Sequence, residues 1–401
     1  MNEKATFKKS LEIGVSCISF YLCSYLFRQL LSVFTPQMLE TGRFDKTMIA
    51  ALSSAYMIAY ALGNLLNGFI GDRVKPKYMV STGLTVAGLA LIFFPLAQEQ
   101  ALRLVLYTAL GFGLSMLRGP LVKTISENMP EKHARVTCMF FSASLCLGPM
   151  LASLFVILFP WEPAFFIAGG LAFVAAVSCL ISLSAMEKSG KIVILLAKTK
   201  EKRNLLAVFK LPRFTINLIT DMMFEVLTIA VVFWAPTYMV QQLHFDDKVA
   251  SVLYFIITAA AAVCPFLCLG CLKLFRDNYM AMMRGMFLLS AVLFIAMWFV
   301  PQPVVNVSLF LLAIMAVNTG CATIWSVFIP SLGPTGLVSS ANGVFDCVGY
   351  ISSGLANLLF AWVMERFDWS GTILTWALLG AVGGAITLLS KLPIFDKQSE
   401  I

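Results

Sequence analysis

The sequence predicts an all-α membrane protein with twelve transmembrane helices, arranged as two pseudo-symmetric halves of six. Hydrophobic residues make up 59% of the 401 residues and charged residues only 12%, about half the charged share of a typical soluble domain. The apolar residues come in runs of about 20, the length that crosses a bilayer. The two halves of the chain also carry matching residues at matching positions.

Apolar runs separated by charged residues, or by Pro and Gly, define the twelve predicted spans. The first run is too long for a cleavable signal and no small-residue cleavage site follows it, so we interpret it as a span. The spans lie near residues 11–35, 47–71, 78–97, 103–125, 134–158, 163–185, 214–240, 247–274, 280–300, 304–329, 337–363 and 370–390.

The charges of the loops orient these spans. Lys and Arg favour the cytoplasmic side of a membrane protein, and the largest basic cluster here runs from Lys188 to Arg213. Both termini are therefore predicted to be cytoplasmic. The opposite loops hold few basic residues: Arg43, Lys46, Arg103, Lys248 and Arg366. The net charge of +8 is then explained by the basic cytoplasmic loops that orient the spans. We therefore expect no nucleic-acid partner.

The basic cluster also divides the chain into two related halves. We predict an N-terminal six-helix half at residues 1–186, a basic cytoplasmic linker at 187–213 and a C-terminal six-helix half at 214–401. Arg28 precedes Pro36 in the first span by the same number of residues as Thr228 precedes Pro236 in the seventh. Repeats of this kind are typical of secondary transporters, in which the substrate lies near mid-membrane.

Charged residues inside the spans are candidate functional residues, because a charge at bilayer depth is costly. Tyr21, Tyr25 and Arg28 recur at helical spacing and form one stripe. An arginine beside two phenols suits an anion, since its guanidinium pairs with carboxylate or phosphate oxygens. The alternative is that Arg28 pairs with an acid of a neighbouring helix and fixes packing.

The seventh span carries a matching stripe of opposite character. Asp221, Glu225 and Thr228 occupy the repeat positions of Tyr21, Tyr25 and Arg28. Carboxylates removed from water are suited to carrying protons. We expect Glu225 and Asp221 to be proton-coupling residues, with a solvated or gate-pairing Asp221 as the alternative.

Two further charges fall within spans. Arg118 in the fourth span is expected either to line the cavity and bind the anion or to extend its side chain to the cytoplasmic side. Asp346 in the eleventh span is a third proton-coupling candidate, and the small residues around it permit close helix approach.

Enzymatic and cofactor functions find no support in the sequence. Cys268 and Cys271 have metal-site spacing, but no second pair follows and the chain has only two histidines. No Gly-x-x-x-x-Gly-Lys-Ser/Thr motif is present for ATP. We predict no catalytic residues, no metal and no cofactor.

The loop after the second span, Gly68-Phe-Ile-Gly-Asp-Arg-Val-Lys-Pro-Lys77, resembles the signature loop of the major facilitator superfamily. This resemblance implies two halves that rock about a central substrate site, and a loop that controls the cytoplasmic gate. Asp72 would pair with a base or with a helix N-terminus. The predicted gating residues are Gly68, Gly71, Asp72, Arg73 and Lys77.

Further segments are similar to the organophosphate:phosphate antiporter family. They are Tyr25-Leu-Phe-Arg28, Ile58-Ala-Tyr60, Trp234-Ala-Pro-Thr-Tyr238 and, in the eleventh span, Asn342-Gly with Val-Gly-Tyr350. In that family, arginines on the first and seventh spans grip the phosphate; Arg28 matches the first, and Thr228 replaces the second. The family's lysine on span two falls on Asn64, its histidine on span five on Ser144, and its tryptophan on span four on Arg118. Tyr21, Tyr25, Tyr60 and Tyr350 match tyrosines that line the family's pore.

These departures favour a substrate with less negative charge than a phosphate dianion. We therefore predict a secondary active transporter of a small organic anion or zwitterion, working by alternating access and coupled to protons. It would be a monomer in a bacterial inner membrane. Two alternatives remain: a proton-coupled efflux pump for cationic amphiphiles, and a solute sensor that does not transport.

Overall fold

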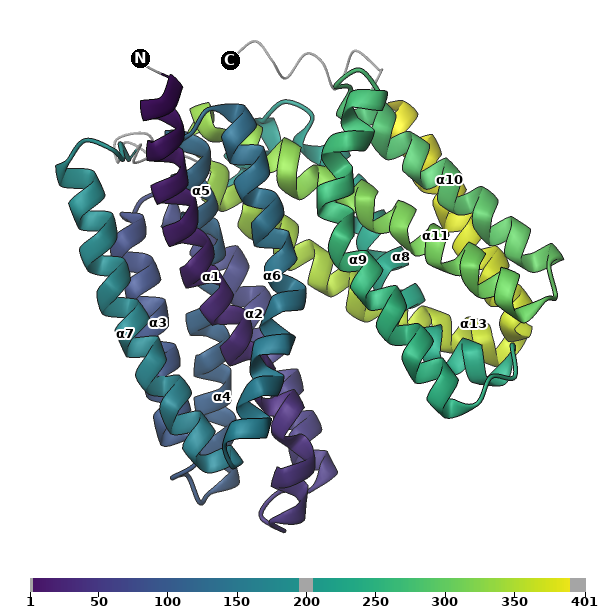
Figure 1. Ribbon diagram of the computed structural model, residues 1–401, viewed down its shortest axis with the longest axis horizontal. Helices are drawn as coiled ribbons and strands as arrows, with labels where there is room; N and C mark the ends of the chain where they lie inside the picture. The colour runs from purple at the N-terminus through teal and green to yellow at the C-terminus, as the bar shows by residue number, and fades with distance from the viewer. Residues whose placement is uncertain (1–2, 195–204, 390–401) are drawn as a thin grey trace. The chain divides into compact units, whose positions relative to one another are not determined.

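The computed structural model describes residues 3–194 and 205–389, and the secondary structure in these ranges is helical throughout (Figure 1). The first half comprises α1 (Glu3–Glu40), α2 (Lys46–Gly71), α3 (Pro76–Phe93), α4 (Gln100–Ser115), α5 (Arg118–Asn128), α6 (Glu131–Leu158) and α7 (Trp161–Lys188). A short 3-10 turn, η1 (Leu205–Lys210), precedes α8 (Phe214–Gln241), α9 (Asp247–Leu274) and α10 (Tyr279–Phe299). The chain continues with α11 (Pro303–Thr323), η2 (Ile324–Phe328), α12 (Ile329–Ser331), η3 (Gly333–Thr335) and α13 (Val338–Leu389).

Counting α4 with α5, α11 with α12, and α13 as two helices, the described chain has the twelve long helical segments predicted from the sequence. The interruptions have local causes. Pro120 lacks the N–H that would bond to the carbonyl of Met116, the residue that follows α4, and Pro330 follows the π turn η2. Asp368 has a φ of 53°, which breaks the helical path of α13.

The helices have the composition and surface of membrane spans. Eight helical segments of the described chain are long and apolar enough to cross a bilayer. Large apolar side chains remain exposed along them, including Leu274 at 80% and Phe255 at 70%. An apolar surface of this extent is unsuited to water and suited to lipid, so the chain is a multi-pass membrane protein.

The chain forms two compact units. The first comprises Met1–Lys202 with Ile329–Cys347, and the second comprises Arg203–Phe328 with Val348–Ile401. In the first, α1 packs on α6, α2 on α4, and α3 on α7. In the second, α8, α9 and α10 all pack on α11. The predicted linker 187–213 includes the boundary between the units, at Lys202 and Arg203. Residues 195–204 of this linker lie outside the described part of the chain.

The grouping of Ile329–Cys347 with the first unit differs from the predicted halves, and a close helix contact explains it. Gly343 of α13 lies against α2, and a Cβ added to it would meet the Cα of Gly68 at 2.9 Å. A Cβ on Gly68 would in turn lie 2.8 Å from the carbonyl oxygen of Ser339. Small residues allow two membrane helices to approach this closely. Gly343 is thus one of the small residues near Asp346 that permit close helix approach, as predicted.

Asp72 anchors the start of α13 to the end of α2. Its carboxylate accepts the backbone N–H groups of Ser339 at 3.2 Å and Ser340 at 3.0 Å, and also the Ser340 hydroxyl. These N–H groups belong to the first turn of α13, which has no intrahelical partners for them. Burial raises the pKa of Asp72, and the nearby Lys123 and the serine donors oppose this rise.

Lys123 of α5 is the basic partner of Asp72. Its side chain is fully buried, and its ammonium lies 3.5 Å from the Asp72 carboxylate and 3.9 Å from that of Glu127. It also donates to the backbone carbonyl of Asp72 at 3.1 Å. Asp72 therefore has both a base and a helix N-terminus as partners, the two possibilities that follow from the loop motif.

We expect Gly343→Ala to lower the apparent melting temperature of the detergent-purified protein. Its new methyl group would collide with α2, and overpacking of this kind costs about 1–3 kcal/mol. Gly170→Ala is the matched control, because no atom lies within 4 Å of the added Cβ and the change should stay within about 1 kcal/mol. Equal stability of the two variants would contradict the tight contact of α2 with α13.

We expect Asp72→Ala to cost more stability than the removal of an ordinary helix cap. Loss of a cap costs about 1 kcal/mol, and Asp45→Ala, which removes a single bond to the N–H of Met48, is the control. Asp72→Ala should exceed it by about 2 kcal/mol because Lys123 stays buried without its nearest carboxylate. Adding Lys123→Met should recover part of this loss in a thermal-unfolding series, and no recovery would contradict the proposed pairing.

Candidate solute-binding and proton-binding sites

The first candidate site is formed by Arg28 of α1 and the aromatic rings around it. The central carbon of its guanidinium lies 5.2 Å from the ring centre of Tyr60, 5.8 Å from that of Tyr25 and 6.0 Å from that of Tyr56. Its Nη2 also contacts the sulfur of Met57 at 3.7 Å. Aromatic faces stabilise a cation without neutralising it. Arg28 therefore keeps its positive charge in a setting built of phenol rings.

The tyrosines around Arg28 form a connected group. Tyr21 and Tyr25 meet edge to face, with their hydroxyls 3.5 Å apart, and Tyr21 stacks on Phe141 of α6 at 4.4 Å. Tyr56 and Tyr60, one turn apart on α2, stack at 5.9 Å. The sequence-based site omitted Tyr56, although its four-residue spacing from Tyr60 was the signal that could have identified it.

The second candidate site is an ion pair between Arg118 and Asp346. Arg118 is the first residue of α5, and its Nη1 donates to Oδ1 of Asp346 on α13. The amide of Asn342, one turn earlier on α13, donates to the other carboxylate oxygen at 2.8 Å. The side chain of Asp346 is 3% exposed and that of Arg118 is 16% exposed. The sequence predicts separate roles for these two residues, whereas the structure pairs them.

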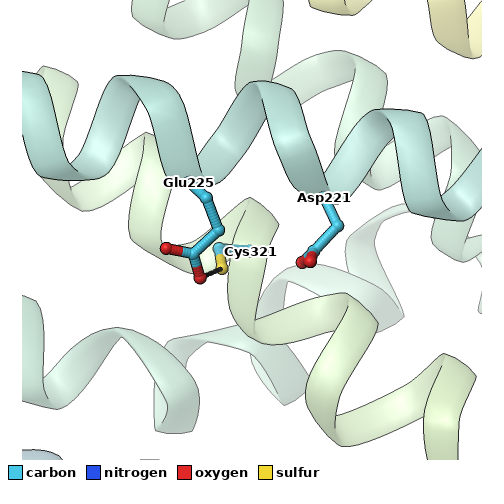
Figure 2. A group of neighbouring side chains, drawn as sticks. All are labelled: Asp221, Glu225 and Cys321. Atoms are coloured by element: carbon cyan, nitrogen blue, oxygen red, sulfur yellow. Dashed lines mark hydrogen bonds between the residues drawn. The ribbon is translucent and has the colours of Figure 1, made fainter. Parts of the chain in front are cut away.

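The third candidate site lies in the second unit and contains Asp221, Glu225 and Cys321. Figure 2 shows the two carboxylates extending from neighbouring turns of α8 beside the thiol of Cys321. The thiol lies 3.8 Å from Oε1 of Glu225 and donates to it. One ligand atom from each of the three residues lies within 4.8 Å of the others. Two carboxylates this close repel when both are ionised, which favours binding of a proton or a cation.

Packing keeps Asp221 away from water, whereas Glu225 and Cys321 are half-buried. Asp221 is fully buried, so the alternative of a solvated Asp221 is wrong. Gly349 of α13 faces the group, since a Cβ added there would lie 3.3 Å from Cγ of Glu225 and 4.0 Å from Oδ2 of Asp221. Glycine at this position leaves room for both acids.

The other predicted site residues are placed less directly. Asn64 is buried and lines a narrow polar gap with Ser115, Ser339 and Asn342. Ser144 is buried and its hydroxyl donates to the backbone carbonyl of Phe140 at 3.1 Å. Thr228 on α8 and Tyr350 on α13 are half-buried.

The remaining residues of the predicted gating loop differ in exposure, and Gly71 is buried. Arg73 is exposed, and Lys77 pairs with Glu187 of α7 at 2.7 Å. Lys75 pairs with the same carboxylate, so the loop is tied to the end of α7 as well as to α13. Cys268, by contrast, packs in an apolar cluster with Leu272 and Met282.

Comparisons with known proteins agree with the fold and the membrane location. The chain is 25% identical over 394 residues to a phosphoglycerate transporter protein of Salmonella typhimurium, covering 88% of this chain and 82% of that protein. It is 22% identical to a glycerol-3-phosphate transporter of Bacillus subtilis, covering 90% and 87%. These relatives resemble the organophosphate:phosphate antiporter family suggested by the sequence motifs, and they are membrane transporters rather than enzymes.

Solved structures show the same architecture. The E. coli fucose:proton symporter FucP superimposes with a TM-score of 0.70 at 14% identity, covering 95% of this chain and 99% of FucP. The human organic anion transporter MFSD10 also has a TM-score of 0.70 at 14% identity, covering 94% and 99%. At this identity the likeness concerns the fold alone. The family model described as Major Facilitator Superfamily matches residues 17–357, and the chain therefore belongs to that superfamily.

Proposed function

We propose that this protein is a secondary active transporter that moves a small organic anion or zwitterion by alternating access, coupled to protons. The observation that carries the proposal is Arg28, a guanidinium held among three tyrosine rings within a membrane-spanning helix. A cation at this depth destabilises the helix in the membrane, so its presence there points to a function. An anionic group of the solute would pair with the guanidinium, and the phenols would orient it by hydrogen bonds.

The charges around the site favour a substrate with one net negative charge or none. Arg28 is surrounded by neutral phenols, and Arg118 already has a carboxylate partner in Asp346. Thr228, at the repeat position of Arg28, adds no charge. A carboxylate or a zwitterion suits this balance better than a phosphate dianion. The named substrates of the relatives, phosphoglycerate and glycerol 3-phosphate, are the first compounds to compare with simple carboxylates.

Proton coupling is assigned to the carboxylates of Asp221, Glu225 and Asp346. Glu225 and Asp221 lie side by side with Cys321, an arrangement in which one proton can be shared by neighbouring acids. Asp346 is a further proton-binding group in the first unit. Alternating protonation of such groups would link solute movement to the proton gradient.

We place the protein in a bacterial inner membrane, as a monomer with both termini in the cytoplasm. The distribution of Lys and Arg between the loops supports the orientation, and the bacterial source of the relatives supports the membrane. Efflux of cationic amphiphiles and sensing without transport remain the two outcomes that would replace this proposal.

We expect an anionic substrate to raise the melting temperature of the purified wild type and to lose this effect in Arg28→Ala. A ligand at 100 times its Kd adds about 2.7 kcal/mol of apparent stability. The screen would include 3-phosphoglycerate, glycerol 3-phosphate, glycerate, amino acids and cationic dyes. Arg28→Lys should restore only part of the effect, because it keeps the charge and loses the planar fork.

Arg103→Ala is the matched control for this screen. Its guanidinium also lies over an aromatic ring, that of Phe44 at 4.3 Å, but it belongs to the first turn of α4. It should lower stability without changing the shift caused by ligand. Stabilisation by dyes alone, lost in Glu225→Gln and kept in Arg28→Ala, would instead identify an efflux pump.

We expect Glu225→Gln to abolish proton-driven uptake in proteoliposomes while solute exchange across the membrane continues. The amide keeps the size of the side chain but cannot carry a proton. Glu162→Gln, which removes an exposed carboxylate paired with Arg43, should leave uptake unchanged. Uptake driven by a pH gradient in Glu225→Gln at the wild-type rate would exclude this residue as the carrier. A solute that binds but is never moved by the wild type would indicate a sensor.

A further inference from the structure

Arg118 is the more exposed partner of its ion pair with Asp346. Both carboxylate oxygens of Asp346 have donors, Arg118 at Oδ1 and Asn342 at Oδ2, and the side chain is almost fully buried. Arg118 retains five times the exposed fraction of its partner, at 16% against 3%. A ligand reaching this pair would therefore meet the guanidinium before the carboxylate.

Packing alone does not account for the pair. Arg118 begins α5, where the helix dipole disfavours a positive charge. Burying an ion pair also costs desolvation, and an apolar pair of similar volume is often at least as stable. The negative charge of Asp346 offsets both penalties while it is ionised. Protonation of Asp346 would remove that charge and make room for the anion of a solute at Arg118.

A further guanidinium, three phenols and two thiols lie near the pair. Arg28 lies close enough for its charge to act on Asp346. The phenols are those of Tyr21, Tyr25 and Tyr60, and the thiols are those of Cys138 and Cys347. Among these residues, Asp346 is the carboxylate paired with Arg118, and its protonation would change the charge beside the guanidinium.

We propose that Asp346 is an internal counter-ion that occupies Arg118 until it is protonated, so that the substrate anion and a proton bind together. This inference rests on the proposed function and names how its anion site is regulated. A proton from solution adds to Asp346, the contact of Arg118 with Asp346 breaks, and a contact of Arg118 with the anion replaces it. The charge of the site is then the same before and after binding of a monoanion.

The test is the pH dependence of anion binding to the full-length protein in detergent. The probe is glycerate, which stays ionised across the range, and affinity is measured by calorimetry from pH 5.5 to 7.5. If one proton is taken up with each anion, the affinity of the wild type should fall about tenfold for each unit of rising pH, over the range in which free Asp346 is ionised. Asp346→Asn should bind glycerate equally at both ends of the range, and Arg118→Gln should bind it weakly throughout.

Two further variants keep the test decisive. Asn342→Ala retains the charge of Asp346 but removes one of its donors, so the pH dependence should move to higher pH. Glu131→Gln removes an exposed carboxylate paired with Arg135 and should behave as the wild type. Wild-type pH dependence in Asp346→Asn would overturn the proposal.

Infrared difference spectra separate this inference from the proposed function. A protonated carboxyl band should appear as the wild type is taken from pH 7.5 to 5.5, and it should be missing from Asp346→Asn. Absence of the band from the wild type overturns the counter-ion role whether or not glycerate binds. Presence of the band, with no anion bound at any pH, overturns the proposed substrate class alone.

Discussion

The absence of water from the bilayer core is the constraint on which the rest of this structure depends. A charge that enters a spanning helix has to find its counter-group within the protein. Lys123 is fully buried and has the carboxylates of Asp72 and Glu127 near it, and Arg118 has Asp346. Arg28 has the faces of three tyrosines. The placement of these partners determines which helices lie together.

The first turns of α13 show how strongly charge and packing cooperate. Gly343 allows the backbones of α2 and α13 to approach, and Asp72 then reaches the N–H groups of Ser339 and Ser340. The same stretch of helix carries Asp346 to Arg118. A single close contact between glycines therefore supports two buried electrostatic contacts, one at the end of the helix and one within the membrane.

Local rules were enough to predict the helices and the stripes upon them. Apolar runs identified twelve segments, and the spacing of Tyr21, Tyr25 and Arg28 placed them on one face, because helical periodicity is a property of neighbouring residues. The pairing of Arg118 with Asp346 joins residues 228 positions apart. Nothing in their local sequences specifies that partner, since it depends on how α2 and α13 pack. The burial of Asp221 follows from tertiary packing for the same reason.

The two arginines of the first unit differ in what an approaching anion must displace. At Arg28 the nearest aromatic groups are neutral, and a cation over an aromatic face gains about 0.5–2 kcal/mol, a contact that an anion can complement. At Arg118 the positive charge is already neutralised by the carboxylate of Asp346, which also accepts a hydrogen bond from the amide of Asn342. An incoming anion must therefore compete with Asp346 at Arg118, whereas at Arg28 it would meet the faces and hydroxyls of tyrosines. Arg28 therefore suits recognition of the solute, and Arg118 suits control of solute binding by the protonation of Asp346.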